Sequence, residues 1–158
     1  MSAEALDATK LLTMSPTQLD HLFESSGPGT IPQGQGKGTV IVVPGTEVAK
    51  SAATVLGAVF WHGKFFRPSS HDLKNEVSPF GVRAIRAEVY TGESWLDDRP
   101  CIVLDYSKSS FVAGWIRDEI REVAPNLYLG LVWGVGRLFG GRKRVLKFAL
   151  TFPAAAVT

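Results

Sequence analysis

The second half of the chain is a series of short apolar runs separated by polar residues that favour turns. Before it, the β-branched run Thr39–Val43, bounded by Gly38 and Pro44, predicts a first strand. Seven further strands are predicted, in chain order Lys64–Arg67, Asp72–Val77, Val82–Thr91, Cys101–Ser107, Trp115–Val123, Leu127–Trp133 and Val145–Phe152. The connections SPFG, LDDRP, APN and GGRK are turn sequences. Because several connections are short, we expect neighbouring strands to pair antiparallel.

One of these segments fits two kinds of element. Val112, Trp115, Ile116, Ile120 and Val123 form an apolar stripe at helical spacing, and this periodicity slightly favours a helix. In a strand, alternate residues of the same segment would face opposite sides of the sheet. We predict the strand, because the segment leads through APN into LYLGLVW as one half of a hairpin would.

The N-terminal part predicts helices. Residues 1–14 are expected to form a tail or a loose first helix. Ser15 and Pro16 are a favourable N-cap and first position for a helix ending near 25–27. A second helix is expected from Thr46, with its end close to 61–63.

The segment 27–38, GPGTIPQGQGKG, is rich in glycine and lacks the phosphate-binding GxxxxGK[ST] motif. We therefore predict an ordered surface loop here. Together, these elements predict a mainly β protein: a small antiparallel barrel of about eight strands with one or two short N-terminal helices. We expect residues 15–158 to form one barrel domain.

Composition narrows the class of protein. Of 158 residues, 45% are hydrophobic and 20% are charged, which is typical of a globular chain. The net charge of +2 is too small to indicate nucleic-acid binding. Cys101 is the single cysteine, so no internal disulfide can form, and a buried, inert thiol is expected. The N-terminus lacks an apolar core typical of a signal peptide, and the apolar stretch Leu127–Gly141 is too short to span a bilayer. We expect a cytoplasmic protein.

The charge is unevenly distributed near the C-terminus. Residues 134–158 contain no acidic side chain, and their basic residues are Arg137, Arg142, Lys143, Arg144 and Lys147. This region is either a solvated hairpin turn or a contact for phosphate or an anionic membrane surface.

Arg99–Trp133 mixes carboxylates, arginines and aromatic rings between apolar runs, which suggests a pocket with polar groups in an apolar wall. Asp105 and Tyr106 should face opposite sides of their strand. If Asp105 points inward it needs a partner, and Arg117 and Arg121 are the candidates. Such a pair could anchor a ligand carboxylate, or it could only fix strand register.

Histidine offers a second kind of chemistry. His62 and Lys64 flank Gly63 at a predicted junction between a helix and a strand. His62 could act as a general base, ligate a haem iron inside the barrel, or only bond the backbone. His21 and His71 have no recognisable metal partners, and no HxH, HExxH or CxxC spacing exists, so we expect no metal site.

Two segments resemble small uncharacterised bacterial proteins with a GxWxG-type signature. In GAVFWHGKFF, residues 57–66, Trp61, Gly63, Lys64 and Phe66 stand at the expected spacings, with Val59 in place of the first glycine. A second block is similar at Asp105, Asp118, Arg121, Val123, Leu129 and Gly130. The resemblance implies a lipocalin-like or calycin-like barrel with an internal cavity, but no activity.

The leading hypothesis is a barrel that binds a small, mostly hydrophobic molecule, lipid-like or pigment-like and with or without a carboxylate. The predicted ligand-binding residues are Trp61, Lys64, Tyr106, Trp115, Arg117, Asp118, Arg121, Tyr128 and Trp133. The alternative is an enzyme of isomerase, cyclase or hydratase type, with His62, Asp105 and Glu119 as candidate catalytic residues. No cofactor other than the haem considered above is predicted, and the protein is expected to be a monomer or homodimer.

Overall fold

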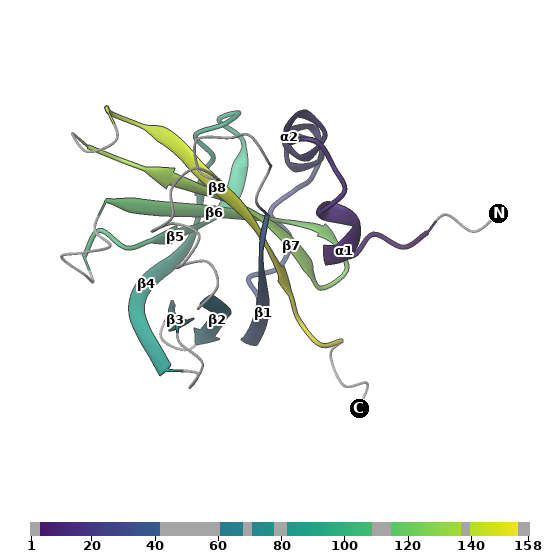
Figure 1. Ribbon diagram of the computed structural model, residues 1–158. Coiled ribbons are helices and arrows are strands. Elements are labelled where there is room, and N and C mark those ends of the chain that lie inside the picture. The colour runs from purple at the N-terminus through teal and green to yellow at the C-terminus, as the bar shows by residue number, and fades with distance from the viewer. Residues whose placement is uncertain are drawn as a thin grey trace.

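The computed structural model describes residues 4–41, 61–67, 71–77, 82–108, 115–136 and 140–154 (Figure 1). For residues 61–62, 75–77 and 82–85 it describes the main chain only. Its strands are β1 (Gly34–Ile41), β2 (Trp61–Arg67), β3 (Asp72–Val77), β4 (Val82–Glu93), β5 (Pro100–Asp105), β6 (Ile116–Ala124), β7 (Leu127–Gly134) and β8 (Lys143–Thr151).

These strands form a closed antiparallel barrel in chain order, and β8 pairs with β1 to close it. The predicted barrel of about eight antiparallel strands is confirmed. Because the barrel is closed, each strand has a hydrogen-bonded neighbour on both sides. The backbone forms the wall of the barrel, and only side chains project into its interior.

The first strand begins earlier than predicted. Gly34–Ile41 is a strand, whereas we expected a loop as far as residue 38 and a strand over Thr39–Val43. The glycines here serve close packing. A Cβ on Gly36 would lie 2.5 Å from the Phe152 ring, and a Cβ on Gly63 of β2 would lie 2.0 Å from the Gly36 carbonyl oxygen. At these positions the absence of a side chain lets β1 approach its neighbours.

The ambiguous segment is a strand. Ile116–Ala124 pairs with β5 on one side and with β7 on the other. Backbone partners on both sides outweigh a helical periodicity that was only slightly better in the sequence. The prediction of a strand here is confirmed, and alternate residues of β6 point into the barrel and away from it.

Two short helices lie on the same side of the barrel (Figure 1). Helix α1 (Ala8–Leu11) falls within the segment predicted as a tail or loose helix. Helix α2 (Pro16–Glu24) begins as predicted, with Ser15 and Gln18 forming a reciprocal capping box. The helix expected from Thr46 falls on residues 42–60, outside the described residues, and 61–63 belong to β2. In the part of the chain that the structure describes, no helix has the length and hydropathy to cross a membrane.

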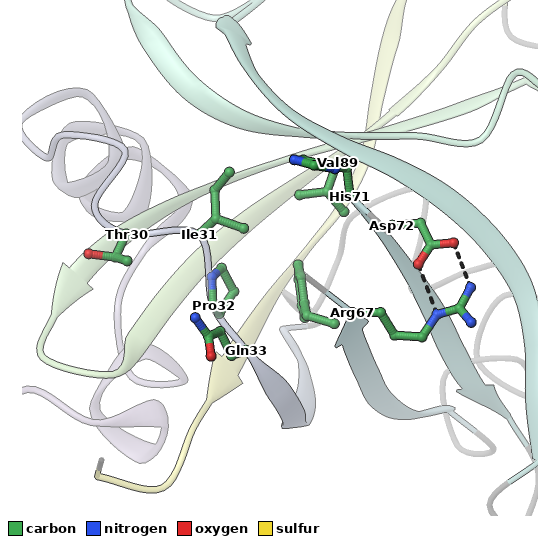
Figure 2. Close-up of a pocket in the computed structure, with 9 residues that line it drawn as sticks. Thr30, Ile31, Pro32, Gln33, Arg67, His71, Asp72 and Val89 are labelled. Carbon is green, nitrogen blue, oxygen red and sulfur yellow. Dashed lines mark hydrogen bonds and ion pairs between the residues drawn. The ribbon is translucent and has the colours of Figure 1, made fainter. Parts of the chain in front are cut away.

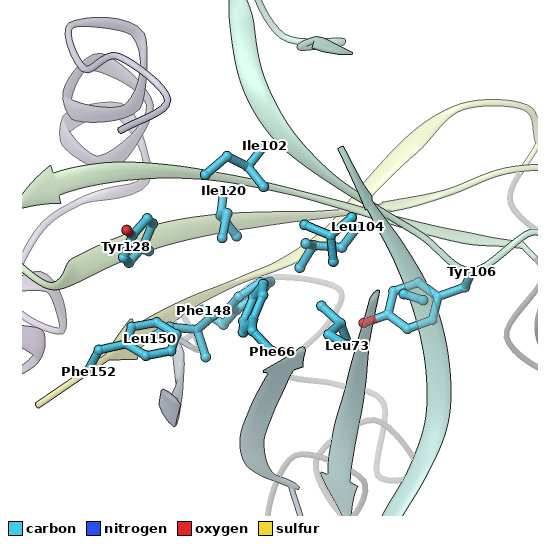
Figure 3. Close-up of a cluster of buried hydrophobic side chains, with 12 residues drawn as sticks. Phe66, Leu73, Ile102, Leu104, Tyr106, Ile120, Tyr128, Phe148, Leu150 and Phe152 are labelled. Atoms are coloured by element: carbon cyan, nitrogen blue, oxygen red, sulfur yellow. The ribbon is translucent and has the colours of Figure 1, made fainter. Parts of the chain in front are cut away.

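The buried side chains form two separate groups. The apolar interior of the barrel, shown in Figure 3, comprises Phe66, Leu73, Ala87, Val89, Ile102, Leu104, Tyr106, Ile120, Tyr128, Phe148, Leu150 and Phe152. The outer core lies between the barrel and the helices and comprises Leu11, Leu19, Phe23, Ile41, Cys101, Val103, Leu127, Leu129, Leu131, Trp133 and Ala149. Both faces of β5 are therefore buried. Burial raises the pKa of the Cys101 thiol to about 12, so this thiol stays protonated at neutral pH.

Candidate functional site

Three polar side chains meet among the apolar side chains of the barrel interior. Lys64 points inward from β2, Asp118 from β6, and Tyr106 from the end of β5. The Lys64 Nζ lies 2.9 Å from Asp118 Oδ2 and donates a hydrogen bond of 2.6 Å to the Tyr106 hydroxyl oxygen. The Tyr106 hydroxyl in turn donates to the same Asp118 Oδ2, at 3.2 Å. We call these three residues the polar cluster.

The polar cluster is almost completely removed from solvent. The Lys64 and Asp118 side chains are 4% and 5% exposed, and Lys64 Nζ lies 5.2 Å from the centre of the Phe148 ring. Burial lowers the pKa of Lys64, and the Asp118 carboxylate offsets part of that effect. Removing both ions from water costs free energy, and the attraction between the two charges offsets only part of this cost. A contribution to the stability of the fold is therefore a weak explanation for the presence of this ion pair.

One oxygen of the polar cluster lacks a partner. Asp118 Oδ1 is buried and accepts no hydrogen bond from the residues that the structure describes. Buried carboxylates in folded proteins nearly always use both oxygens, because an unsatisfied acceptor costs about 1–3 kcal/mol. The free oxygen is thus the feature of the polar cluster that a purely structural ion pair does not explain.

A pocket of about 330 Å³ opens at one end of the barrel (Figure 2). Its apolar wall includes Ile31, Pro32, Phe66 and Val89. The size is at the lower end of the range for small-molecule sites. Phe66 also belongs to the apolar interior, and Lys64 is the next inward-facing residue of β2. The pocket and the polar cluster therefore lie along the same strand.

The polar part of the pocket wall is held by an ion-pair network. Asp72 accepts hydrogen bonds from Arg67 at 2.8 and 2.5 Å, and a further one from Arg86. Burial alone would raise the pKa of Asp72, but these two guanidinium groups keep it below its ordinary value. His71, with φ of 52°, presents its carbonyl to the Val89 N–H beside them. These groups hold the β2–β3 side of the pocket in place.

Residues 28–33, which we call the strap, form the other side of the pocket. The Tyr128 hydroxyl donates to the Thr30 carbonyl oxygen at 2.5 Å, and the Thr30 N–H donates to Glu122 Oε2 at 3.3 Å. The Glu122 N–H donates to the Pro28 carbonyl. Burial raises the pKa of the Tyr128 hydroxyl to about 12, so it remains a donor across the ordinary pH range. The strap is fastened to β6 and β7 by these bonds.

Four of the predicted ligand-binding residues point into the barrel: Lys64, Tyr106, Asp118 and Tyr128. The structure brings the first three together, whereas Tyr128 lies beside Phe152 near the strap, with ring centres 5.5 Å apart. Trp61 and His62 have side chains outside the described residues, so their predicted roles stay predictions. The Trp115 side chain is 43% exposed.

Arg121 does not reach the interior, contrary to our expectation. It lies on the outer face of β6, fully buried beneath helix α2, and its guanidinium is 4.4 Å from the Phe23 ring. It forms two hydrogen bonds with Asp97, at 2.7 and 2.8 Å, and donates to three backbone carbonyl groups. Its donors are thus used to fasten the helix and the 94–99 turn to the barrel.

Arg117, Glu119 and Trp133 also lie on the outer side. Glu119 is completely buried there and accepts hydrogen bonds from Ser94 at 2.6 Å and from Arg117 at 3.2 Å. The ring of Trp133 packs edge-on against Trp95, with centres 5.9 Å apart. The predicted placement of these residues in a cavity is therefore wrong. The sequence did not show that helices and the 94–99 turn would bury the outer face as well.

Asp105 faces outward, with Cys101 and Val103. It accepts hydrogen bonds from the Tyr90 hydroxyl at 3.1 Å and from the Ser107 N–H at 2.9 Å. Burial alone would raise the pKa of Asp105, but the Ser107 and Tyr90 hydrogen bonds bring it below its ordinary value. The sequence left open whether Asp105 points inward. It does not, and the inward carboxylate is Asp118, which pairs with a lysine instead of an arginine.

The basic region near the C-terminus is partly engaged. Arg144 and Lys147 pair with Asp20 of helix α2, at 2.5 and 3.3 Å. The Arg142 guanidinium lies 3.9 Å from the centre of the Trp95 ring. Lys143 is exposed, and Arg137 lies outside the described residues. Contact with a membrane surface stays a prediction.

The pocket residues Ile31, Pro32, Arg67, His71 and Asp72 were not predicted as site residues. No local motif marks them, because the strap reaches β2 only through the pairing of β1 with β2, in which Gly34 lies opposite Phe66. In the described part of the chain, no group of three His, Cys, Asp or Glu side chains is arranged to hold a metal ion.

Comparison with known proteins supports the architecture. No protein-family model matches the sequence, and no curated protein matches it. The crystal structure of a protein from Thermomonospora curvata is similar, with a TM-score of 0.59 and 18% sequence identity over 89% of this chain and 88% of that chain. At this identity the likeness shows a shared fold alone. A closed eight-stranded antiparallel barrel fits the lipocalin-like architecture that the sequence resemblance implied.

Proposed function

We propose that the protein binds a small, mostly apolar molecule inside its barrel, with the polar end of that molecule at the polar cluster. The observation that carries the proposal is the buried Asp118 oxygen without a partner, among interior side chains that are mostly apolar wherever the structure describes them. A few polar groups fixed in an apolar wall are the usual composition of a small-molecule site.

The pocket beneath the strap supports the proposal. Its wall is mostly apolar, and Phe66 separates it from Lys64 along β2. A molecule lodged in the pocket therefore reaches the polar cluster when the Phe66 ring moves aside. The Arg67–Asp72 pair holds the β2–β3 wall of the pocket during that movement.

We also propose kinship with the GxWxG-type barrel proteins. Gly63, the second glycine of that signature, has a φ of 143° and lies against the Gly36 carbonyl oxygen. Any side chain there would separate β1 from β2, which gives the glycine of the signature a physical reason.

The proposal can be tested with the apolar fluorescent probe N-phenyl-1-naphthylamine. We expect saturable binding to the unmodified protein and weaker binding to Val89→Phe, because the added ring fills the pocket. Val123→Phe adds the same ring on the outer side, where Val123 is partly buried, and should leave the affinity unchanged. Circular dichroism would confirm that both variants are folded. An absence of saturable binding to the unmodified protein would refute the proposal.

The alternative of an acid–base enzyme acting on an apolar substrate now depends on the polar cluster. Asp105 and Glu119 face outward, whereas Lys64, with its lowered pKa, touches both a carboxylate and a phenol. Such a set can move a proton within hydrogen-bond reach of a bound molecule. Turnover of a bound ligand that is lost in Asp118→Asn, while binding persists, would favour the enzyme over the binding protein.

A further inference from the structure

We propose that the molecule held at the polar cluster is a neutral alcohol, whose hydroxyl group donates a hydrogen bond to Asp118 Oδ1. This inference rests on the proposed function above and names the class of ligand. The sequence alone left open whether the ligand carries a carboxylate, and the geometry of the polar cluster distinguishes these two classes.

The atom of the polar cluster that lacks a partner, Asp118 Oδ1, is a hydrogen-bond acceptor. Asp118 Oδ2 already accepts from Lys64 at 2.9 Å and from Tyr106 at 3.2 Å, whereas no donor in the described part of the chain reaches Oδ1. A buried carboxylate oxygen binds a donor strongly, because water cannot compete for it. A ligand that only accepts hydrogen bonds would leave this oxygen unsatisfied.

A ligand carboxylate does not fit this position. It would lie beside the Asp118 carboxylate, and like charges in a buried site repel each other strongly. Among the interior side chains that the structure describes, Lys64 is the single cation, and Asp118 already neutralises it. The two arginines expected to bind a ligand acid, Arg117 and Arg121, are on the outer face. At the pocket, Arg67 is held by Asp72.

A ligand ammonium is disfavoured for the opposite reason. It would approach the buried Lys64 ammonium, which is only 2.9 Å from the same carboxylate. A neutral donor avoids both repulsions. A hydroxyl group can donate to Asp118 Oδ1 while its oxygen remains available as an acceptor. The apolar interior around the polar cluster then contacts the hydrocarbon part of the alcohol.

Displacement of N-phenyl-1-naphthylamine by three ligands of equal chain length tests the inference. The competitors are decanol, the methyl ketone 2-decanone and, near neutral pH, ionised decanoate. We expect decanol to bind about ten-fold more tightly than the ketone, since a hydrogen bond to a buried carboxylate is worth at least one factor of ten. Decanoate should be the weakest of the three.

The double variant Lys64→Met/Asp118→Leu is the control, because it replaces the pair by apolar side chains of similar shape. In this variant we expect the affinities for decanol and 2-decanone to converge. The inference is overturned if the unmodified protein binds the ketone or decanoate as tightly as decanol, or if the double variant keeps the preference. If neither the probe nor any competitor binds, the proposed function itself fails. The ranking in the unmodified protein decides the matter even if the double variant does not fold.

Discussion

The Lys64–Asp118 pair gives the sharpest prediction about stability. Its atoms are 2.9 Å apart and its side chains are 4% and 5% exposed. At an effective dielectric constant of about 20, Coulomb's law gives an attraction of about 6 kcal/mol at this separation. The desolvation of two ions costs several kcal/mol each, so the intact pair contributes little net stability.

Removal of one partner leaves the other charge buried without the ion pair that it forms at 2.9 Å. We therefore expect Lys64→Met and Asp118→Leu each to lower the free energy of unfolding by about 3–5 kcal/mol. The double variant removes both charges together. Its free energy of unfolding should fall by no more than about 1–2 kcal/mol, because the main loss is that of the Tyr106 hydrogen bonds to Lys64 and Asp118.

Urea unfolding of the four proteins measures this cycle directly. The expected coupling energy between the two positions is at least about 4 kcal/mol. Single variants that each lose less than about 1 kcal/mol would show that the pair is solvated. A double variant as unstable as the two losses combined would show that the charges act independently, and either result would refute the reasoning.

Three further predictions concern pH and the strap. Burial lowers the folded-state pKa of Lys64 below 10.5, so the stability of the unmodified protein relative to Lys64→Met should increase as the pH rises towards 10.5. Urea unfolding at a series of pH values would show this, and a flat or falling difference would contradict it. Hydrogen bonds from Arg121 lower the pKa of Asp97 from 3.8 to about 2, so Asp97→Asn should lose about 1–2 kcal/mol near neutral pH. In the same assay that loss should disappear as the pH falls from about 4 to about 2, and a loss independent of pH would refute the assignment. Gly29→Ala should lose about 1–3 kcal/mol and expose the strap to proteases, because Gly29 has a φ of +72° and its added Cβ would lie 2.4 Å from a side-chain carbon of β6. In limited proteolysis, Gly27→Ala is the matched control, with nothing within 4 Å of its Cβ, and equal cleavage of both variants would count against the strap contacts.

The number, order and pairing of the strands could be predicted because their signals are local. β-branched runs end at turn sequences, and short connections require antiparallel neighbours. The start of β1 was missed because glycine usually marks a turn, whereas Gly36 serves a close approach to the Phe152 ring. That reason depends on a residue more than a hundred positions away, and local sequence does not contain it.

Whether each polar side chain points into the barrel or away from it was harder to predict, for a physical reason. In many barrels one face of each strand is wet, so alternation identifies the interior. Here α1, α2 and the 94–99 turn bury the outer face of β5 to β7, and the outward Glu119 and Arg121 are as buried as the inward Asp118. When both faces of a strand are buried, polar and apolar residues no longer alternate between an outer and an inner face, so the sequence does not distinguish the two faces. Tyr106 lies on the same face of β5 as the apolar residues Ile102 and Leu104. This alternation along the strand was the one sequence feature that placed a member of the polar cluster inside the barrel.

The most direct measurement is a high-resolution crystal structure of the protein soaked with decanol. We predict that the alcohol lies inside the barrel, with its oxygen within hydrogen-bond distance of Asp118 Oδ1 and its chain against the apolar interior. An interior without the alcohol, in which Oδ1 is bonded only to an ordered water in a space too small for a ligand, would contradict it.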